Sequence, residues 1–98
     1  MTKQPRVYIM ANKRNGMIYT GVTSDLPKRV WQRRECVADG FTKRYGCKKL
    51  VWFEQHDTME SAILREKQIK AGNRNAKLAL IEAQNPQWRD LIADVAQG

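Results

Sequence analysis

Two short apolar segments separated by a polar one open the chain. Residues 6–11 and 17–22 are rich in β-branched and aromatic side chains, which predicts the two strands of a β-hairpin. If the loop has four residues, 12–15, Tyr8 lies opposite Tyr19. The two-residue period of a strand then places both phenol rings on one sheet face, with the glycine of the second strand.

The next segment has helical periodicity. Residues 23–25, Thr-Ser-Asp, offer N-cap side chains, and Pro27 fits the first turn, so a helix is predicted over residues 25–37. Arg29 and Arg33 are four residues apart and share one side of it. Residues 38–48 contain two glycines and are expected to form a loop. The apolar side of the helix consists of Leu26, Val30 and Val37.

The second half of the chain predicts a third strand and three helices. The strand covers 49–56, and Asp57 with Glu60 resembles a capping box that opens a helix over 58–71. A Gly-Asn pair ends this helix, and another follows over 75–84. A last helix, opened by an Asn-Pro pair, is expected to hold Trp88, Leu91, Ile92 and Val95.

This order of elements predicts an α+β fold, in which a three-stranded, mostly antiparallel sheet is flanked by helices. The chain has 98 residues, of which 42% are hydrophobic. A chain of this length can bury one modest core, so one domain is expected over residues 1–98.

The charge distribution indicates a polyanionic partner. The formal net charge is +8. Residues 1–52 contain 12 Lys and Arg against 3 Asp and Glu, whereas residues 53–98 contain 6 against 7. The cations are spaced among apolar residues, which is typical of the surface of a folded unit, and they can neutralise the phosphates of a nucleic acid.

Cysteine content and hydropathy point to the cytoplasm. Cys36 and Cys47 are eleven residues apart in a chain with one His, so neither a zinc site nor a disulfide framework is indicated, and two reduced thiols are expected. No apolar segment approaches the roughly 20 residues needed to span a bilayer, and the N-terminus lacks the apolar core of a signal peptide. A cytoplasmic protein without a membrane partner is therefore expected.

Glu66 stands where a core residue is expected. Helical spacing places it among four apolar side chains, Met59, Ala62, Ile63 and Ile69. An ionised carboxylate there must reach the edge of the stripe, pair with a cation such as Lys70, or bind a metal. The helix alone favours the pair with Lys70 over the metal.

Two tyrosines and an arginine are the other candidates for chemistry. Taken singly, Tyr8 and Tyr19 are expected to be half-buried packing residues. As a pair beside Gly21, they could orient or deprotonate a water, since glycine leaves room for a phosphate backbone. Arg29 could bind a phosphoryl oxygen if its helix crosses the same face, although most helical arginines are only solvated.

These residues resemble the motif that names the GIY-YIG endonucleases. Val7-Tyr8-Ile9 and Tyr19-Thr20-Gly21 lie eleven residues apart from tyrosine to tyrosine. Arg29 and Glu66 fall where that family has its arginine and its metal-binding glutamate. The chain is most similar to the small single-domain bacterial members, through Tyr19 to Leu26, Phe41 to Gly46, Arg65 to Lys70 and Asn85 to Leu91.

The resemblance implies a role for each residue. Glu66 would hold one divalent cation, Mg²⁺ or Mn²⁺, against the scissile phosphate. Tyr8 would act as general base on the attacking water, directly or through a neighbour, and Tyr19 would orient the water or the phosphate. Arg29 would stabilise the negative charge of the transition state. No small-molecule cofactor is expected.

One position departs from the family. Many relatives have a His one turn after the helical arginine, whereas this chain has Arg33. An arginine can bind phosphate but cannot accept a proton at neutral pH. His56, at the end of the third strand, is expected to be a surface residue rather than a replacement.

Nine further cations lie within 37 residues of the chain, and each is a candidate phosphate contact or a solvated surface residue. They are Lys13, Arg14, Lys28, Arg33, Arg34, Lys43, Arg44, Lys48 and Lys49. The three tryptophans could stack on unpaired bases. Their spacing favours the core instead, for Trp31, Trp52 and Trp88 alike.

Three functions fit these residues. The first is a metal-dependent DNA endonuclease that is structure-directed or weakly specific, because no second domain for reading sequence is evident and phosphate contacts carry no sequence information directly. The second is a nucleic-acid-binding module that has the same fold but cuts weakly or not at all. The third is an RNA-binding protein.

Overall fold

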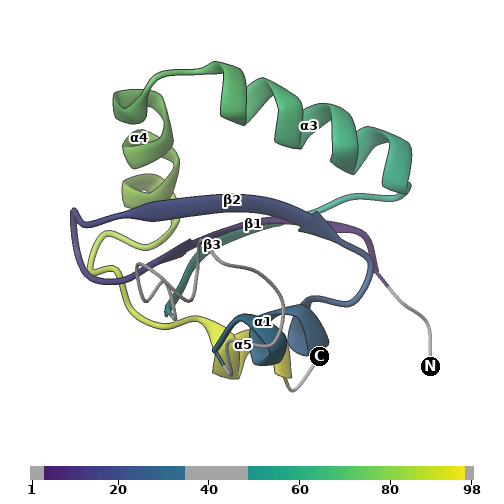
Figure 1. Ribbon diagram of the computed structural model, residues 1–98, viewed down its shortest axis with the longest axis horizontal. Coiled ribbons are helices and arrows are strands. Elements are labelled where there is room, and N and C mark those ends of the chain that lie inside the picture. The colour runs from purple at the N-terminus through teal and green to yellow at the C-terminus, as the bar shows by residue number, and fades with distance from the viewer. Residues whose placement is uncertain (1–3, 35–48, 97–98) are drawn as a thin grey trace.

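The computed structural model describes residues 4–34 and 49–96 and has the predicted α+β fold (Figure 1). Three antiparallel strands form one sheet in the order β2-β1-β3. The elements are β1 (Arg6–Ala11), β2 (Ile18–Thr23), α1 (Leu26–Arg34), β3 (Lys49–Gln55), α3 (Met59–Ala71), α4 (Arg74–Gln84) and α5 (Ile92–Ala96). The predicted bounds agree to within about a residue for every strand and for the helices α3 and α4.

The sheet lies between two helical layers, with α3 and α4 on one face and α1 and α5 on the other (Figure 1). Alternate residues of the central strand β1 serve the two faces. Its odd-numbered residues join the core beneath α3 and α4, and its even-numbered residues join the core beneath α1 and α5. The first core includes Val7, Ile9, Ala11, Ala62, Ile69 and Ile81, and the second includes Tyr8, Met10, Leu26, Val30, Leu91 and Val95.

The hairpin register differs from the predicted one. The turn closes where the Gly16 amide donates to the Lys13 carbonyl (3.0 Å), and Asn15 adopts a positive φ of 58°. Tyr8 therefore lies opposite Gly21, and the predicted pairing of Tyr8 with Tyr19 is wrong. Because the register moves by two residues, both phenols still share one face with Gly21.

The free edge of β3 is covered by side chains from the end of α4. The side-chain amide of Gln84 accepts from the Phe53 amide (3.1 Å) and donates to the Phe53 carbonyl (2.8 Å), as a neighbouring strand would. Asn85, which is only 3% exposed, donates to the carbonyls of Val51 (3.1 Å) and Arg89 (2.8 Å). These bonds satisfy backbone groups that an edge strand otherwise presents to other chains.

The predicted last helix is wrong over its first half. Residues 85–91 run irregularly past β3, where the Leu91 amide donates to the Leu50 carbonyl (2.7 Å), and α5 begins at Ile92. Trp88 is fully buried with a positive φ of 55°. The Asn-Pro pair does end α4, but it leads into a segment tied to the sheet instead of into a new helix.

The start of α3 also differs from the prediction. Thr58, not Asp57, is the N-cap residue, and its hydroxyl accepts from the Ser61 amide (3.2 Å).

The end of the predicted helix over 25–37, the loop 38–48 and both cysteines lie outside the described residues. None of the described helices is long and apolar enough to cross a membrane.

A first prediction concerns the contact between Gly21 and Tyr8. A Cβ atom on Gly21 would lie 2.5 Å from the Tyr8 hydroxyl oxygen and 2.6 Å from its ring carbon. The ring cannot swing away freely, because Tyr8 is 1% exposed. Gly21→Ala is therefore expected to lower the free energy of unfolding by about 1–3 kcal/mol, measured by urea denaturation.

Gly72→Ala is the matched control. A Cβ atom there meets nothing closer than 3.4 Å, and the backbone φ of −77° suits alanine. Its effect should stay within about 0.5 kcal/mol. Equal stability losses in the two variants would contradict the close packing of Tyr8 over Gly21.

Candidate active site at the edge of the sheet

The phenol of Tyr8 lies over the backbone of the edge strand β2. The ring occupies the space that a side chain at position 21 would fill, so glycine is required there for this packing. The rings of Tyr8 and Tyr19 are 6.4 Å apart between centroids and tilted by 39°. The structure thus brings Tyr8, Gly21 and Tyr19 together. The space above Gly21, which was expected to admit a phosphate backbone, is filled by the Tyr8 ring.

The two tyrosines differ in their access to solvent. Tyr8 is 1% exposed, whereas Tyr19 is half-buried. A group this deeply buried cannot meet bulk water directly, so any proton transfer by Tyr8 would pass through a neighbouring group. Tyr19 is the phenol nearer to a substrate on the surface.

Arg29 lies on the helix that covers the face of the tyrosines. Helix α1 packs through Leu26 and Val30 on the same core as Tyr8, and Tyr19 packs against that core. Arg29 is half-buried, between the packed side of α1 and its solvent side. The helix of Arg29 therefore covers the face of the tyrosines, which is the condition that the sequence analysis set for a role of Arg29.

Glu66 lies in the other helical layer. Helix α3 packs on the opposite face of the sheet, against β2 and β1. The Glu66 side chain is 16% exposed, and its Oε2 is 3.4 Å from the Lys70 Nζ, the pair that the helix alone predicts. Glu66 is therefore partly exposed to solvent, and the sheet lies between its helix and the helix that carries Arg29.

The donor set around Glu66 fits a cation that has few protein ligands. No group of three or more His, Cys, Asp or Glu side chains is close enough to hold a metal ion within the described segments. Mg²⁺ commonly uses one or two carboxylates and takes its other ligands from water and phosphate. A single, partly exposed carboxylate suits this arrangement.

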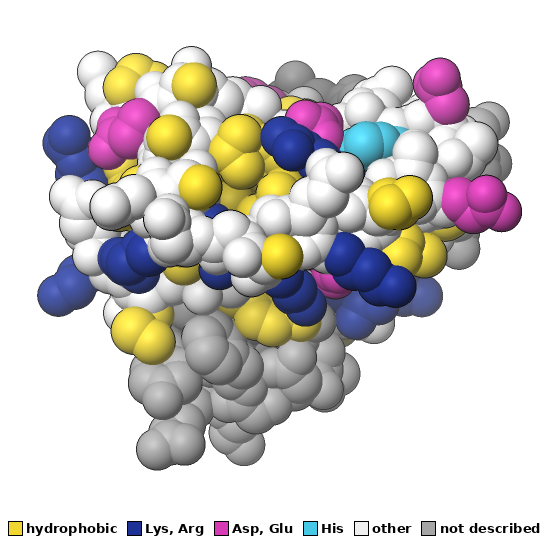
Figure 2. Space-filling view, turned by 90° about the horizontal axis from the view of Figure 1, so that it is seen from above, with side chains coloured by type: hydrophobic (Ala, Val, Ile, Leu, Met, Phe, Trp, Pro, Cys, Tyr) yellow, Lys and Arg dark blue, Asp and Glu magenta, His cyan; other side chains and the backbone are white. Residues whose placement is uncertain are grey.

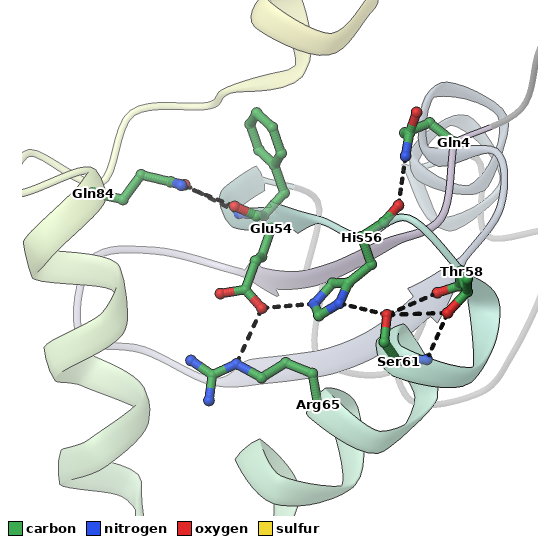
Figure 3. A network of polar contacts seen from close by, with 8 residues as sticks. Gln4, Glu54, His56, Thr58, Ser61, Arg65 and Gln84 are labelled. Atoms are coloured by element: carbon green, nitrogen blue, oxygen red, sulfur yellow. Dashed lines mark hydrogen bonds and ion pairs between the residues drawn. The ribbon is translucent and has the colours of Figure 1, made fainter.

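A network of polar contacts joins the end of β3 to the start of α3 (Figure 3). His56 contacts Glu54 Oε1 through Nε2 (2.7 Å) and Ser61 Oγ through Nδ1 (3.0 Å). Arg65 Nε donates to the same Glu54 oxygen (3.1 Å). These contacts fix the helix that carries Glu66 onto the sheet, and they give His56 a structural role that the sequence did not reveal.

The face formed by α3 and α4 carries cations and carboxylates side by side (Figure 2). A groove of about 180 Å³ lies between the two helices, lined by Arg65, Gln68, Ile69, Gly72, Ala76, Lys77 and Leu80. Mixed charge gives a polyanion little preference for this face. The excess of cations instead comes from the residues before β3.

The predicted phosphate contacts fall into three groups. Lys13, Arg14 and Lys28 are exposed, and Lys49 is half-buried. Arg33 and Arg34 belong to α1, and their side chains lie outside the description. Lys43, Arg44 and Lys48 lie outside the described residues altogether.

The hairpin loop that carries Lys13 and Arg14 is held by the start of α4. Arg74 Nη2 donates to the carbonyls of Asn15 (2.9 Å) and Gly16 (2.6 Å). The loop therefore presents its two cations from a defined backbone, and Arg74 is a structural contributor to this surface that the sequence did not reveal.

The tryptophans do not behave alike. Trp52 (4% exposed) and Trp88 (0%) belong to the core, as predicted. Trp31 is 57% exposed, so its predicted place in the core is wrong.

This fold and motif belong to a known class of domain. The family model described as the GIY-YIG catalytic domain matches residues 4–79. The chain therefore belongs to the GIY-YIG family, as its motifs indicate. The match indicates a nuclease-type domain with nucleic acid as its substrate class.

Similar proteins carry the name UPF0213. The UPF0213 protein SSP2268 of Staphylococcus saprophyticus is 36% identical over 75 residues, which cover 76% of this chain and 90% of that protein. The UPF0213 protein CPE1444 of Clostridium perfringens is 37% identical over 79 residues, which cover 81% and 84%. The solution NMR structure of the UPF0213 protein BH0048 from Bacillus halodurans has the same fold, with a TM-score of 0.56 and 24% identity over 89% of this chain and 92% of that one.

A second prediction tests the hairpin loop as a phosphate-binding element. Replacing both Lys13 and Arg14 by Gln should weaken binding to all nucleic-acid sequences equally. It should also lower the slope of log K against log salt by about 1–2, because each lost phosphate contact contributes roughly 0.7–0.9. The measurement is a fluorescence-anisotropy titration at several salt concentrations.

Arg89→Gln is the control for the loss of charge. Arg89 is exposed and lies beside β3, at the edge of the sheet opposite β2. The same change per charge in Arg89→Gln would show that only net charge matters. An unchanged slope in the loop variant would show that neither loop cation contacts a phosphate.

Proposed function

We propose that this protein is a divalent-metal-dependent endonuclease that hydrolyses phosphodiester bonds in DNA. The observation that carries the proposal is the packing of Tyr8 across Gly21, beside Tyr19, on the edge strand β2. The helices that carry Arg29 and Glu66 flank this strand from opposite faces. A phosphodiester lying along the edge could contact both layers at once.

Each residue has a role suited to its surroundings. Arg29 would donate hydrogen bonds to phosphoryl oxygens, where negative charge grows in the transition state. Tyr19 would orient the attacking water or the phosphate. Tyr8 would act on that water through a neighbouring group, because its own ring is buried, and its hydroxyl would pass its own proton on as it takes up the proton of the water.

Glu66 would hold one Mg²⁺ or Mn²⁺ through its carboxylate, exchanging Lys70 for the cation. Such an ion would withdraw charge from the scissile phosphate when bound. The cations Lys13, Arg14 and Lys28 would contact phosphates on either side. Phosphate contacts position a nucleic acid without reading its sequence, so a structure-directed or weakly specific activity is proposed.

The second candidate is a module that binds nucleic acid and cuts weakly or not at all. Arg33 favours it, because this position cannot serve as a proton acceptor. His56 offers no replacement, since both of its ring nitrogens are engaged by Glu54 and Ser61. A cleavage assay in Mn²⁺, combined with a binding measurement, separates the two candidates.

A third prediction tests catalysis directly. Purified protein is incubated with branched, nicked and single-stranded DNA, with Mn²⁺ or with EDTA. Cleavage should require Mn²⁺, and Glu66→Gln and Tyr8→Phe should each lower its rate at least about a hundredfold. Tyr8→Phe keeps the ring that packs over Gly21 and removes only the hydroxyl.

The matched control is Glu60→Gln, which removes an exposed carboxylate from the same helix. It should cleave at the wild-type rate, and all variants should bind DNA in EDTA as the wild type does. Saturating binding with no product in Mn²⁺ would favour the binding module. Tighter binding to RNA at matched salt would replace DNA as the proposed substrate.

A further inference from the structure

Trp31 is a large apolar side chain left in solvent on a basic helix. It is 57% exposed, although indoles are usually buried to a large extent. Helix α1 already buries Leu26 and Val30, and each residue advances about 100° around a helix. Trp31 follows Val30 directly, so it points well away from the core.

The helix around Trp31 is strongly cationic. Residues 26–34 contain four Lys and Arg and no Asp or Glu. Lys28 is exposed and precedes Trp31 by three residues, which places the two side chains next to each other on the helix surface. An indole beside an ammonium group on a basic helix offers both components of a single-strand binding surface.

The positions between Arg29 and Trp31 form one continuous arc. At about 100° per residue, the order around the solvent side of α1 is Arg29, Gln32, Lys28 and Trp31. Arg29 borders the candidate active site, and Trp31 ends the arc on the far flank of the helix. A strand bound at Arg29 could therefore follow the arc and reach the indole with a neighbouring nucleotide.

We propose that Trp31 stacks on an unpaired base of a bound nucleic-acid strand, while Lys28 contacts a phosphate of the same strand. The inference rests on nucleic acid as the partner in the proposed function, but it does not depend on cleavage. A base inside a duplex has no free face for an indole. The protein should therefore prefer single-stranded or branched substrates, and this preference would come from α1.

The choice of probe separates the contribution of the bases to binding from the contribution of the phosphates. In EDTA, binding is measured to a short oligothymidylate, to an abasic oligonucleotide of equal length and to a duplex. Trp31→Ala should weaken binding to the oligothymidylate about five- to a hundredfold. It should leave binding to the abasic oligonucleotide within about twofold, because the phosphate contacts remain. An oligouridylate tests whether RNA bases stack equally well.

Fluorescence provides an independent readout. Trp52 and Trp88 are 4% and 0% exposed, so Trp31 is the tryptophan that a base can reach. The oligothymidylate should quench the emission of the wild type, and Trp31→Phe should lose this quenching. Trp31→Phe should also bind within a few-fold of the wild type, since phenylalanine keeps an aromatic face.

Leu64→Ala is the matched control, because Leu64 is 58% exposed on the opposite helical layer. Its binding should be unchanged. Equal losses of Trp31→Ala on the thymidylate and abasic probes would overturn the stacking proposal. Self-association that disappears in Trp31→Ala, without any base-dependent quenching, would overturn it in favour of a protein contact.

The outcomes distinguish this inference from the proposed function. Quenching and base-dependent binding without cleavage in Mn²⁺ would support the role of Trp31 and reject the endonuclease. Cleavage that is unaffected in Trp31→Ala on single-stranded DNA would support the endonuclease and reject the role of Trp31.

Discussion

The sheet separates the residues that a nuclease site needs to combine. Arg29 and Glu66 lie on helices that cover opposite faces, so they share no space within either helical layer. Strand β2 is at the edge of the sheet, and the proposed function requires one ligand to contact both layers around it. Tyr8 reaches this edge from the central strand because Gly21 has no side chain in its way. The geometry of the candidate site thus depends on one glycine.

The two edges of the sheet are treated differently. At β3, Gln84 and Asn85 bond the backbone, and the segment 85–91 runs alongside. At the C-terminal end of β3, the contacts of His56 with Glu54 and Ser61 anchor α3. These interactions hold the β3 edge and the helix of Glu66 in place, while the proposed function assigns substrate binding to β2 and the cationic elements next to it.

The sequence predicted the strands, the fold class and the residues of the motif, because these follow from local features such as apolar periodicity and glycine positions. The prediction failed where non-local contacts determine the structure. The hairpin register depends on where the turn closes, and residues 85–91 stay irregular because their backbone bonds to β3. For Trp31 the signal was present, since its position lies outside the predicted apolar side of α1. Whether Arg29 and Glu66 can both reach one ligand could not be predicted, because it depends on how the two helical layers flank the edge of the sheet.

The pairing of Tyr8 with Gly21 supports a role for the Tyr8 hydroxyl beyond packing. Glycine within a strand costs roughly 0.5–1 kcal/mol relative to alanine, and a buried phenol needs a hydrogen-bond partner. A smaller apolar residue at position 8 with alanine at position 21 would fill a core without either cost. Binding through Lys13, Lys28 and Trp31 would tolerate that exchange. The combination of Tyr8 with Gly21 is therefore better explained by the proposed chemistry at the β2 edge than by binding alone.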